Sequence, residues 1–92
     1  MLPNGDGSEF AVAPVLNVYP NPTTGLLTVE PGLRMEETLW VEVSDDAGRR
    51  VLEQPVSEAR LSIDLSRLQT GIYFLHLRSG DKRLETKRVV KY

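Results

Sequence analysis

Apolar and polar residues alternate in short segments along this chain, and residues typical of turns separate the segments. In residues 39–44 (LWVEVS) every second residue is aliphatic, so these side chains share one face of an extended strand. Residues 72–77 (IYFLHL) are the most apolar run and predict a strand buried inside a sheet. The segments that we expect to form strands are 15–19, 26–29, 39–44, 49–54, 60–65, 72–77 and 83–91.

Proline, glycine and aspartate mark the turns between these segments. Residues 20–25 (PNPTTG) hold two prolines, which fix φ, and Gly25, which tolerates a positive φ. Residues 45–48 (DDAG) predict a hairpin with Gly48 in the left-handed conformation. Seven short strands at a spacing of about ten residues, without a helical period, predict an all-β fold, a seven-stranded immunoglobulin-like Greek-key β-sandwich.

The corner before the apolar run carries a tyrosine signature, Leu68-x-x-Gly71-x-Tyr73. In Greek-key sandwiches a tyrosine at such a corner buries its ring and returns its hydroxyl to nearby backbone. A buried hydroxyl needs a partner, because leaving it unpaired costs free energy. We therefore expect Tyr73 inside the fold and the strand after Gly71 in the centre of its sheet.

The turn after that strand should centre on Gly80 and Asp81 and lead directly into the last strand. Such a turn places three pairs of residues opposite one another: Leu77 with Leu84, His76 with Glu85, and Arg78 with Arg83. The first pair keeps an apolar side chain beside an apolar one, which favours this register. The phase of alternation puts His76 on the outer face of the sheet.

The length of 92 residues indicates one domain, which we place at residues 15–92. Residues 1–14 show no alternation and are expected to be a disordered linker or a cloning remnant. The formal charge of −2 divides unevenly, with −5 in residues 1–80 and +3 in residues 81–92. A basic last strand fits either an interaction segment or an edge strand whose lysines discourage unwanted pairing.

Composition and spacing argue against several classes of protein. The chain has no cysteine, which excludes disulfides and cysteine-ligated zinc. It has no apolar run of the ~20 residues that a membrane helix needs. It has no Gly-rich phosphate loop, nucleophile elbow or nucleic-acid-binding signature, and its only histidine is His76. We therefore expect a protein that is not an enzyme and that uses no metal, cofactor, nucleic acid or small-molecule substrate.

Three stretches, in this order and spacing, resemble the C-terminal sorting domains of the bacterial type IX secretion system (type A). Residues 18–29 (VYPNPTTGLLTV) are similar to the opening of that family, residues 64–77 (DLSRLQTGIYFLHL) to its central motif, and residues 87–91 (KRVVK) to its closing motif. The motif positions that we expect to be structural are Tyr19, Pro20, Asn21, Pro22, Gly25, Leu68, Gly71 and Tyr73.

The resemblance implies a non-catalytic signal that directs a passenger protein across the outer membrane. Members of the family pass through the periplasm and are recognised by the translocon and by outer-membrane shuttle proteins. A sortase-like cysteine peptidase usually removes the domain at the cell surface, and the passenger stays there or becomes extracellular. We expect the passenger and its leader to be missing from this sequence, since no signal peptide is visible at its start.

The basic closing motif is the recognition element that we expect from the charge reversal and the resemblance. A partner with an acidic surface would meet it faster, and a partner strand would pair with it if the last strand lies at a sheet edge. The residues of this candidate element are Lys87, Arg88, Val89, Val90 and Lys91.

Two other functions fit the same strand pattern. One is an immunoglobulin-like or fibronectin-like adhesion or carbohydrate-binding module of a secreted protein, in which Trp40 would belong to a sugar-binding face. The other is a small calcium-dependent domain with Asp45 and Asp46, or Glu36 and Glu37, as oxygen ligands. Neither acidic pair has the spacing of a known calcium loop, and the first pair is also typical of a turn.

Overall fold

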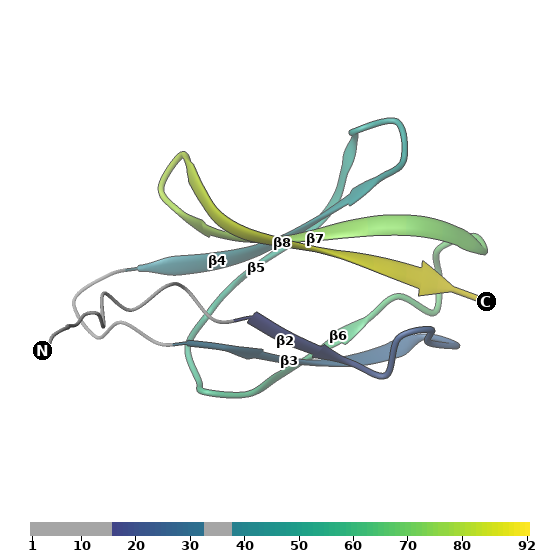
Figure 1. Ribbon diagram of the computed structural model, residues 1–92, viewed down its shortest axis with the longest axis horizontal. Helices are drawn as coiled ribbons and strands as arrows, with labels where there is room; N and C mark the ends of the chain where they lie inside the picture. The colour runs from purple at the N-terminus through teal and green to yellow at the C-terminus, as the bar shows by residue number, and fades with distance from the viewer. Residues whose placement is uncertain (1–15, 33–37) are drawn as a thin grey trace, which may run out of the picture.

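The computed structural model describes residues 16–32 and 38–92, which form seven β-strands and no helix. The strands are β2 (Leu16–Tyr19), β3 (Leu26–Pro31), β4 (Leu39–Asp45), β5 (Arg50–Pro55), β6 (Leu61–Asp64), β7 (Gly71–Ser79) and β8 (Lys82–Lys91). One antiparallel sheet has the order β2-β3-β6 and the other the order β5-β4-β7-β8, and the sheets form two layers (Figure 1). Within these residues there is no helix of the length and apolar character that a membrane crossing requires.

All seven predicted strands are present, with ends that differ from the expected ones by up to two residues. The strand that was expected to be central, β7, lies between β4 and β8 in the four-stranded sheet. The predicted segment 1–14, Val15, Glu36 and Glu37 lie outside the described residues. The all-β prediction is therefore confirmed for the part of the chain that the structure describes.

The core lies between the two sheets and takes alternate residues from the strands of both. Its buried members are Leu16, Leu27, Val29, Leu39, Val41, Val43, Leu61, Ile63, Leu65, Tyr73, Leu75, Leu77 and Val89. Alternation along each strand sends these side chains to one face, as the sequence pattern of β4 predicts. Because β8 supplies Val89 to this core, the last strand is part of the folded body.

The predicted register between β7 and β8 is right only next to the turn. Arg78 pairs with Arg83 as expected, but Leu77 pairs with Glu85 and His76 with Thr86, and a shift in register separates Leu77 from Arg78. The predictions that Leu77 faces Leu84 and that His76 faces Glu85 were therefore wrong by one residue.

Side-chain phase explains this β-bulge. A slip of one residue moves every side chain of a strand to the opposite face. Without the shift, Val89 would lie opposite Ile72 on the outer face and Arg88 opposite Tyr73 in the core. With the shift, Val89 lies opposite Tyr73 and is buried, and Arg88 lies opposite Phe74 on the outer face. The extra residue in β8 thus corrects a mismatch between the turn and the core.

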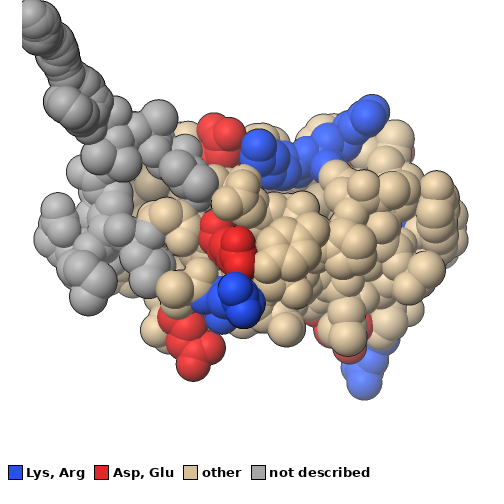
Figure 2. Space-filling view, turned by 60° about the horizontal axis from the view of Figure 1, so that its bottom comes forward, with Lys and Arg blue, Asp and Glu red and all other residues tan. Residues whose placement is uncertain are grey.

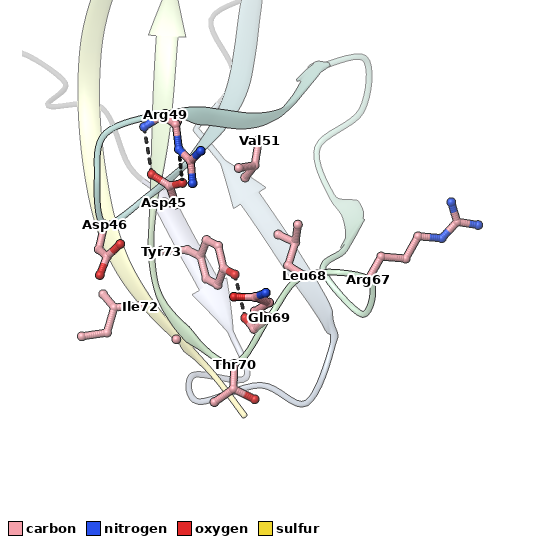
Figure 3. Close-up of a pocket in the computed structure, with 11 residues that line it drawn as sticks. Asp45, Asp46, Arg49, Val51, Arg67, Leu68, Gln69, Thr70, Ile72 and Tyr73 are labelled. Atoms are coloured by element: carbon pink, nitrogen blue, oxygen red, sulfur yellow. Dashed lines mark hydrogen bonds and ion pairs between the residues drawn. The ribbon is translucent and has the colours of Figure 1, made fainter.

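The predicted corner forms around Tyr73, which is only 6% exposed. Its hydroxyl donates a hydrogen bond to the carbonyl of Gln69 at 2.6 Å, and the N–H of Leu68 donates to the carbonyl of Leu65 at 2.9 Å. A hollow of about 420 Å³ lies between this corner and the β4–β5 hairpin, and Figure 3 shows the Tyr73 ring among the residues that line it. The expected partner for the buried hydroxyl is therefore present.

The glycines in the turns have different roles. Gly48 and Gly80 have positive φ values of 86° and 59°, so both need the freedom of glycine. Gly25 tolerates a positive φ but does not adopt one. A Cβ atom there would lie 3.1 Å from the Cβ of Ser66, so close packing explains this glycine instead. Nothing in the structure explains why Gly71 is glycine.

Candidate functional site

The first turn of the chain is hydrogen-bonded to the last strand. The side chain of Asn21 donates from Nδ2 to the carbonyl of Arg88 at 2.7 Å and accepts from the N–H of Val90 at 3.0 Å. An amide side chain carries the same donor and acceptor as a peptide group, so Asn21 pairs with β8 as a neighbouring strand would. Figure 1 shows this turn and the C-terminal end of β8 at the same end of the molecule.

Thr23 continues this contact beyond Asn21. Its N–H donates to the carbonyl of Val90, and its carbonyl accepts from the N–H of Tyr92, both at 2.9 Å. Its hydroxyl donates to the carbonyl of Leu26 at 2.7 Å and accepts from the N–H of Gly25 at 3.0 Å. The backbone groups on the outer edge are thus paired from the carbonyl of Arg88 to the N–H of Tyr92.

The opening motif contributes unequally to this contact. Pro20 and Pro22 flank Asn21, are exposed, and follow cis peptide bonds. Tyr19 is the last residue of β2 in the three-stranded sheet and is 43% exposed. Leu68 of the central motif is half-buried against the core. The structure therefore brings the opening motif to the closing motif through Asn21 and Thr23.

The five residues of the candidate recognition element differ strongly in exposure. Lys87 and Arg88 are exposed, and Val90 is half-buried. Val89 is 1% exposed in the core. Lys91 is 6% exposed, and its Nζ donates to the main-chain oxygen of Tyr92 at 3.1 Å. Only Lys87 and Arg88 therefore present whole side chains to a partner.

Basic side chains continue along β8 toward its beginning. The strand carries exposed Lys82 and Arg83 in addition to Lys87 and Arg88. Arg83 lies 3.3 Å from Glu42 of β4, and Lys87 lies 3.9 Å from Glu85. The exposed pair of Lys87 with Glu85 contributes little to stability, about 0–1 kcal/mol, whereas the partner of Arg83, Glu42, is buried. The basic character of this edge therefore remains available for binding.

A second group of polar side chains lies on the outer face of the three-stranded sheet. The Tyr19 hydroxyl donates to Glu30 Oε2 at 2.6 Å, and Arg60 Nε donates to the same oxygen at 2.9 Å. These hydrogen bonds hold the pKa of Glu30 below its usual value and raise the pKa of Tyr19. Figure 2 shows that the rest of this face is mostly uncharged.

A family of known proteins matches almost the whole of the described chain. Residues 17–91 match the model of the secretion system C-terminal sorting domain. The chain belongs to the type IX C-terminal sorting domain family. No curated protein matches the chain. Membership makes the sorting domain a signal for type IX secretion, and it makes the protein that carries the signal a secreted one, exported to the cell surface or outside the cell.

The match confirms the resemblance seen in the three motifs and adds contacts that the sequence did not reveal. Asn21 was expected to serve a turn, but its partners are Arg88 and Val90. The signal for this contact was weak, because asparagine is common in turns for local reasons. The burial of Val89 and Lys91 was not predicted, because the register expected from the turn places both residues on the outer face of the sheet.

The candidate chemical groups of the sorting domain are engaged in structural contacts. Asp45 accepts from the N–H groups of Ala47 and Arg49 at 3.0 and 2.9 Å, which lowers its pKa and favours the turn prediction over the calcium one. Among residues 16–32 and 38–92, no group of three or more histidine, cysteine or acidic side chains is placed to hold a metal ion. The guanidinium of Arg78 lies 5.7 Å from the ring centre of Trp40, so it occupies one face of that ring.

His76 lies on the outer face, as its phase predicted, but it is only 6% exposed. Its Nδ1 hydrogen-bonds with Thr86 Oγ1 at 2.8 Å, and its Nε2 lies 3.4 Å from Ser44 Oγ. Burial lowers the pKa of His76, nearby Arg83 lowers it further, and Glu42 opposes both. The folded domain therefore favours the neutral imidazole.

This histidine should make the sorting domain less stable as the pH falls. In the unfolded chain His76 takes up a proton near its ordinary pKa of about 6.5, whereas the folded domain resists protonation. The unfolded state then binds more protons, so the free energy of unfolding decreases as the pH falls below about 6.5. Urea titrations at pH 7.5 and 5.5 should show this loss, and His76→Gln should reduce it. An equal loss in the variant would contradict the prediction.

Proposed function

We propose that this chain is a non-catalytic sorting signal that directs an attached passenger protein across the outer membrane. The observation that supports it most is the family match over residues 17–91. A label for unrelated passengers must hold its information within itself, and a rigid body displays a surface at little ordering cost. The adhesion and carbohydrate-binding alternative has no comparable support, since Arg78 occupies one face of Trp40.

The route that we propose passes through the periplasm. There the sorting domain folds and is recognised by the translocon and by outer-membrane shuttle proteins. A sortase-like cysteine peptidase then removes it by cutting ahead of the domain, and the passenger remains at the surface or outside the cell. The family to which the chain belongs supports this route.

The fold that we propose for the sorting domain is the immunoglobulin-like Greek-key β-sandwich. In its support, β3 pairs with β6, while β4 and β5 between them in sequence belong to the other sheet. Such crossing between sheets and a tyrosine corner are both features of Greek-key sandwiches. The contact of Tyr73 with the Gln69 carbonyl fits the second feature.

Within the closing motif we propose a division of roles. Lys87 and Arg88 are exposed and would contact an acidic surface of the machinery. Val89 is buried in the core, and Lys91 is buried beside it at the end of the strand, so both would hold β8 in place. Removing residues 88–92 would therefore damage the fold and the contact together, and side-chain reversal is the sharper test.

The test is an export assay with a fluorescent reporter. The reporter is placed between an ordinary signal peptide and residues 15–92, in a bacterium that has the type IX machinery. We expect fluorescence in the medium or at the cell surface, and none there when the sorting domain is missing. Reversal of both charges, Lys87→Glu with Arg88→Glu, should lower the exported fraction about three- to tenfold, which corresponds to about 0.7–1.4 kcal/mol.

A matched reversal controls for net charge. Arg50→Glu with Arg67→Glu changes the charge by the same amount but leaves the basic residues of β8 intact, and it should be exported within about twofold of the wild type. Retention of the wild-type fusion in the periplasm would contradict the proposed function. Equal export of the two double variants would contradict the role of Lys87 and Arg88.

A further inference from the structure

The edge of β8 is open over only part of its length. Val90 directs its N–H and carbonyl away from β7, toward Asn21 and Thr23. The ladder between β7 and β8 is regular from residue 91 back to residue 85, so Thr86 and Arg88 also direct their backbone groups away from β7. The side chain of Asn21 donates a hydrogen bond to the Arg88 carbonyl. Among residues 16–32 and 38–92, no group pairs with the N–H of Arg88 or with the backbone of Thr86.

This open segment is an unusual edge for the fold. Of the four edge strands, β8 has ten residues, whereas β2, β5 and β6 have four, six and four. A long edge strand exposes unpaired backbone groups that accept a further strand. Asn21 and Thr23 close it beyond residue 88, so an added strand would stop at that point. The open part therefore has a defined end.

Charge specifies the chemistry of the strand that fits there. Residues 82–88 carry four basic side chains and one acidic one, a net charge of +3. Lys87 and Arg88 are neighbours and lie on opposite faces of the sheet, so they flank the open edge on both sides. A second copy of this edge would bring like charges together, which disfavours pairing between two copies of the domain. An acidic segment has the complementary charge.

We propose that the type IX machinery recognises the sorting domain by adding an extended acidic segment of a partner protein to the open edge of β8. The segment pairs with the backbone of Thr86 and the N–H of Arg88, and the Asn21 turn fixes where it ends. Lys87 and Arg88 pair with its acidic side chains. This inference rests on the proposed function, and it names the backbone groups that carry recognition.

Proline provides a direct test, because it removes a backbone N–H without changing the charge of the strand. Proline is tolerated in edge strands where the N–H faces solvent, so Thr86→Pro should leave the ladder to β7 intact. Thr86→Val is the matched control, since it also loses the hydroxyl that contacts His76 but keeps the N–H. In the export assay we expect Thr86→Pro to lower the exported fraction at least tenfold and Thr86→Val to stay within about twofold of the wild type.

A second proline variant, at Arg88, keeps the test informative if Thr86→Pro does not fold. Arg88→Pro removes the other outward N–H, and Arg88→Gln is its control for the lost charge. Thermal melts of the purified domains identify the proline variants that remain folded, and at least one of the two should. Export of the wild type together with wild-type export of a folded proline variant would overturn the inference and leave the proposed function standing. Failure of the wild type itself to be exported would overturn both.

The same variants distinguish a second copy of the chain from a partner protein. Sedimentation of the wild-type domain should show a monomer at micromolar concentration. A dimer that Thr86→Pro converts to a monomer would show that another copy occupies the edge, and it would overturn the inference. Failure of both proline variants to fold would also overturn it, because their outward N–H groups would then not be free.

Discussion

Replacing Tyr73 with alanine is expected to lower the free energy of unfolding by about 3–5 kcal/mol, the usual cost of removing a buried aromatic ring. The ring is 6% exposed in the core, and its hydroxyl closes the corner by donating to the Gln69 carbonyl. A domain of this size has about 4–12 kcal/mol of stability in total, so the loss is at least about a quarter of that total. Urea unfolding followed by Trp40 fluorescence measures the loss.

The phenylalanine variant separates the ring from the hydroxyl. Tyr73→Phe keeps the packing and loses one hydrogen bond, so it should cost about 0.5–1.5 kcal/mol. The order alanine, phenylalanine, wild type in increasing stability is the expected result. A phenylalanine variant as unstable as alanine would mean that the corner depends on its hydrogen bond and that the ring contributes little.

Replacing Asn21 with alanine is expected to cost about 1–3 kcal/mol, because it removes two hydrogen bonds of about 0.5–1.5 kcal/mol each. Both join the first turn to β8, at the carbonyl of Arg88 and the N–H of Val90. The loss should therefore appear locally as well as globally. Hydrogen exchange of the Val90 amide should accelerate more than that of Tyr73, which lies in the interior strand β7.

Two further variants make the Asn21 prediction specific. Asn21→Asp keeps an acceptor for the Val90 N–H but replaces the donor to Arg88 with a negative charge, so Val90 should remain partly protected. Asn17→Ala changes an exposed asparagine of the neighbouring strand β2 and should alter stability by less than about 0.5 kcal/mol. Unchanged exchange at Val90 in the Asn21→Ala variant would refute the role of the side chain.

The strands and the corner were predictable because their causes are local in sequence. Strands β3, β4, β6 and β7 repeat an apolar residue at every second position of their buried faces, and β4 shows this most clearly. The corner contacts involve Leu68, Gln69 and Tyr73, which lie within six residues of one another. The sheet order could not be read in the same way, because pairs such as β3 with β6 join strands that are far apart in the sequence.

The candidate site was predicted in part for the same reason. The exposed basic pair Lys87 and Arg88 lies in a strand whose charge was visible from the sequence. The bulge was missed because a turn at Gly80 and Asp81 sets one register, while the burial of Val89 demands another. Asn21 and Arg88 are 67 residues apart in the sequence, so no local pattern predicts the contact between them.

The hydrogen bonds between Asn21 and β8 also affect the order in which the domain can fold during its synthesis. The ribosome adds Asn21 long before Arg88 and Val90. The hydrogen bonds of the opening turn therefore cannot form until nearly the whole domain has been translated. Folding from the N-terminal side alone therefore cannot complete the structure. The nascent polypeptide therefore reaches its finished form only when the residues of the last strand have been made.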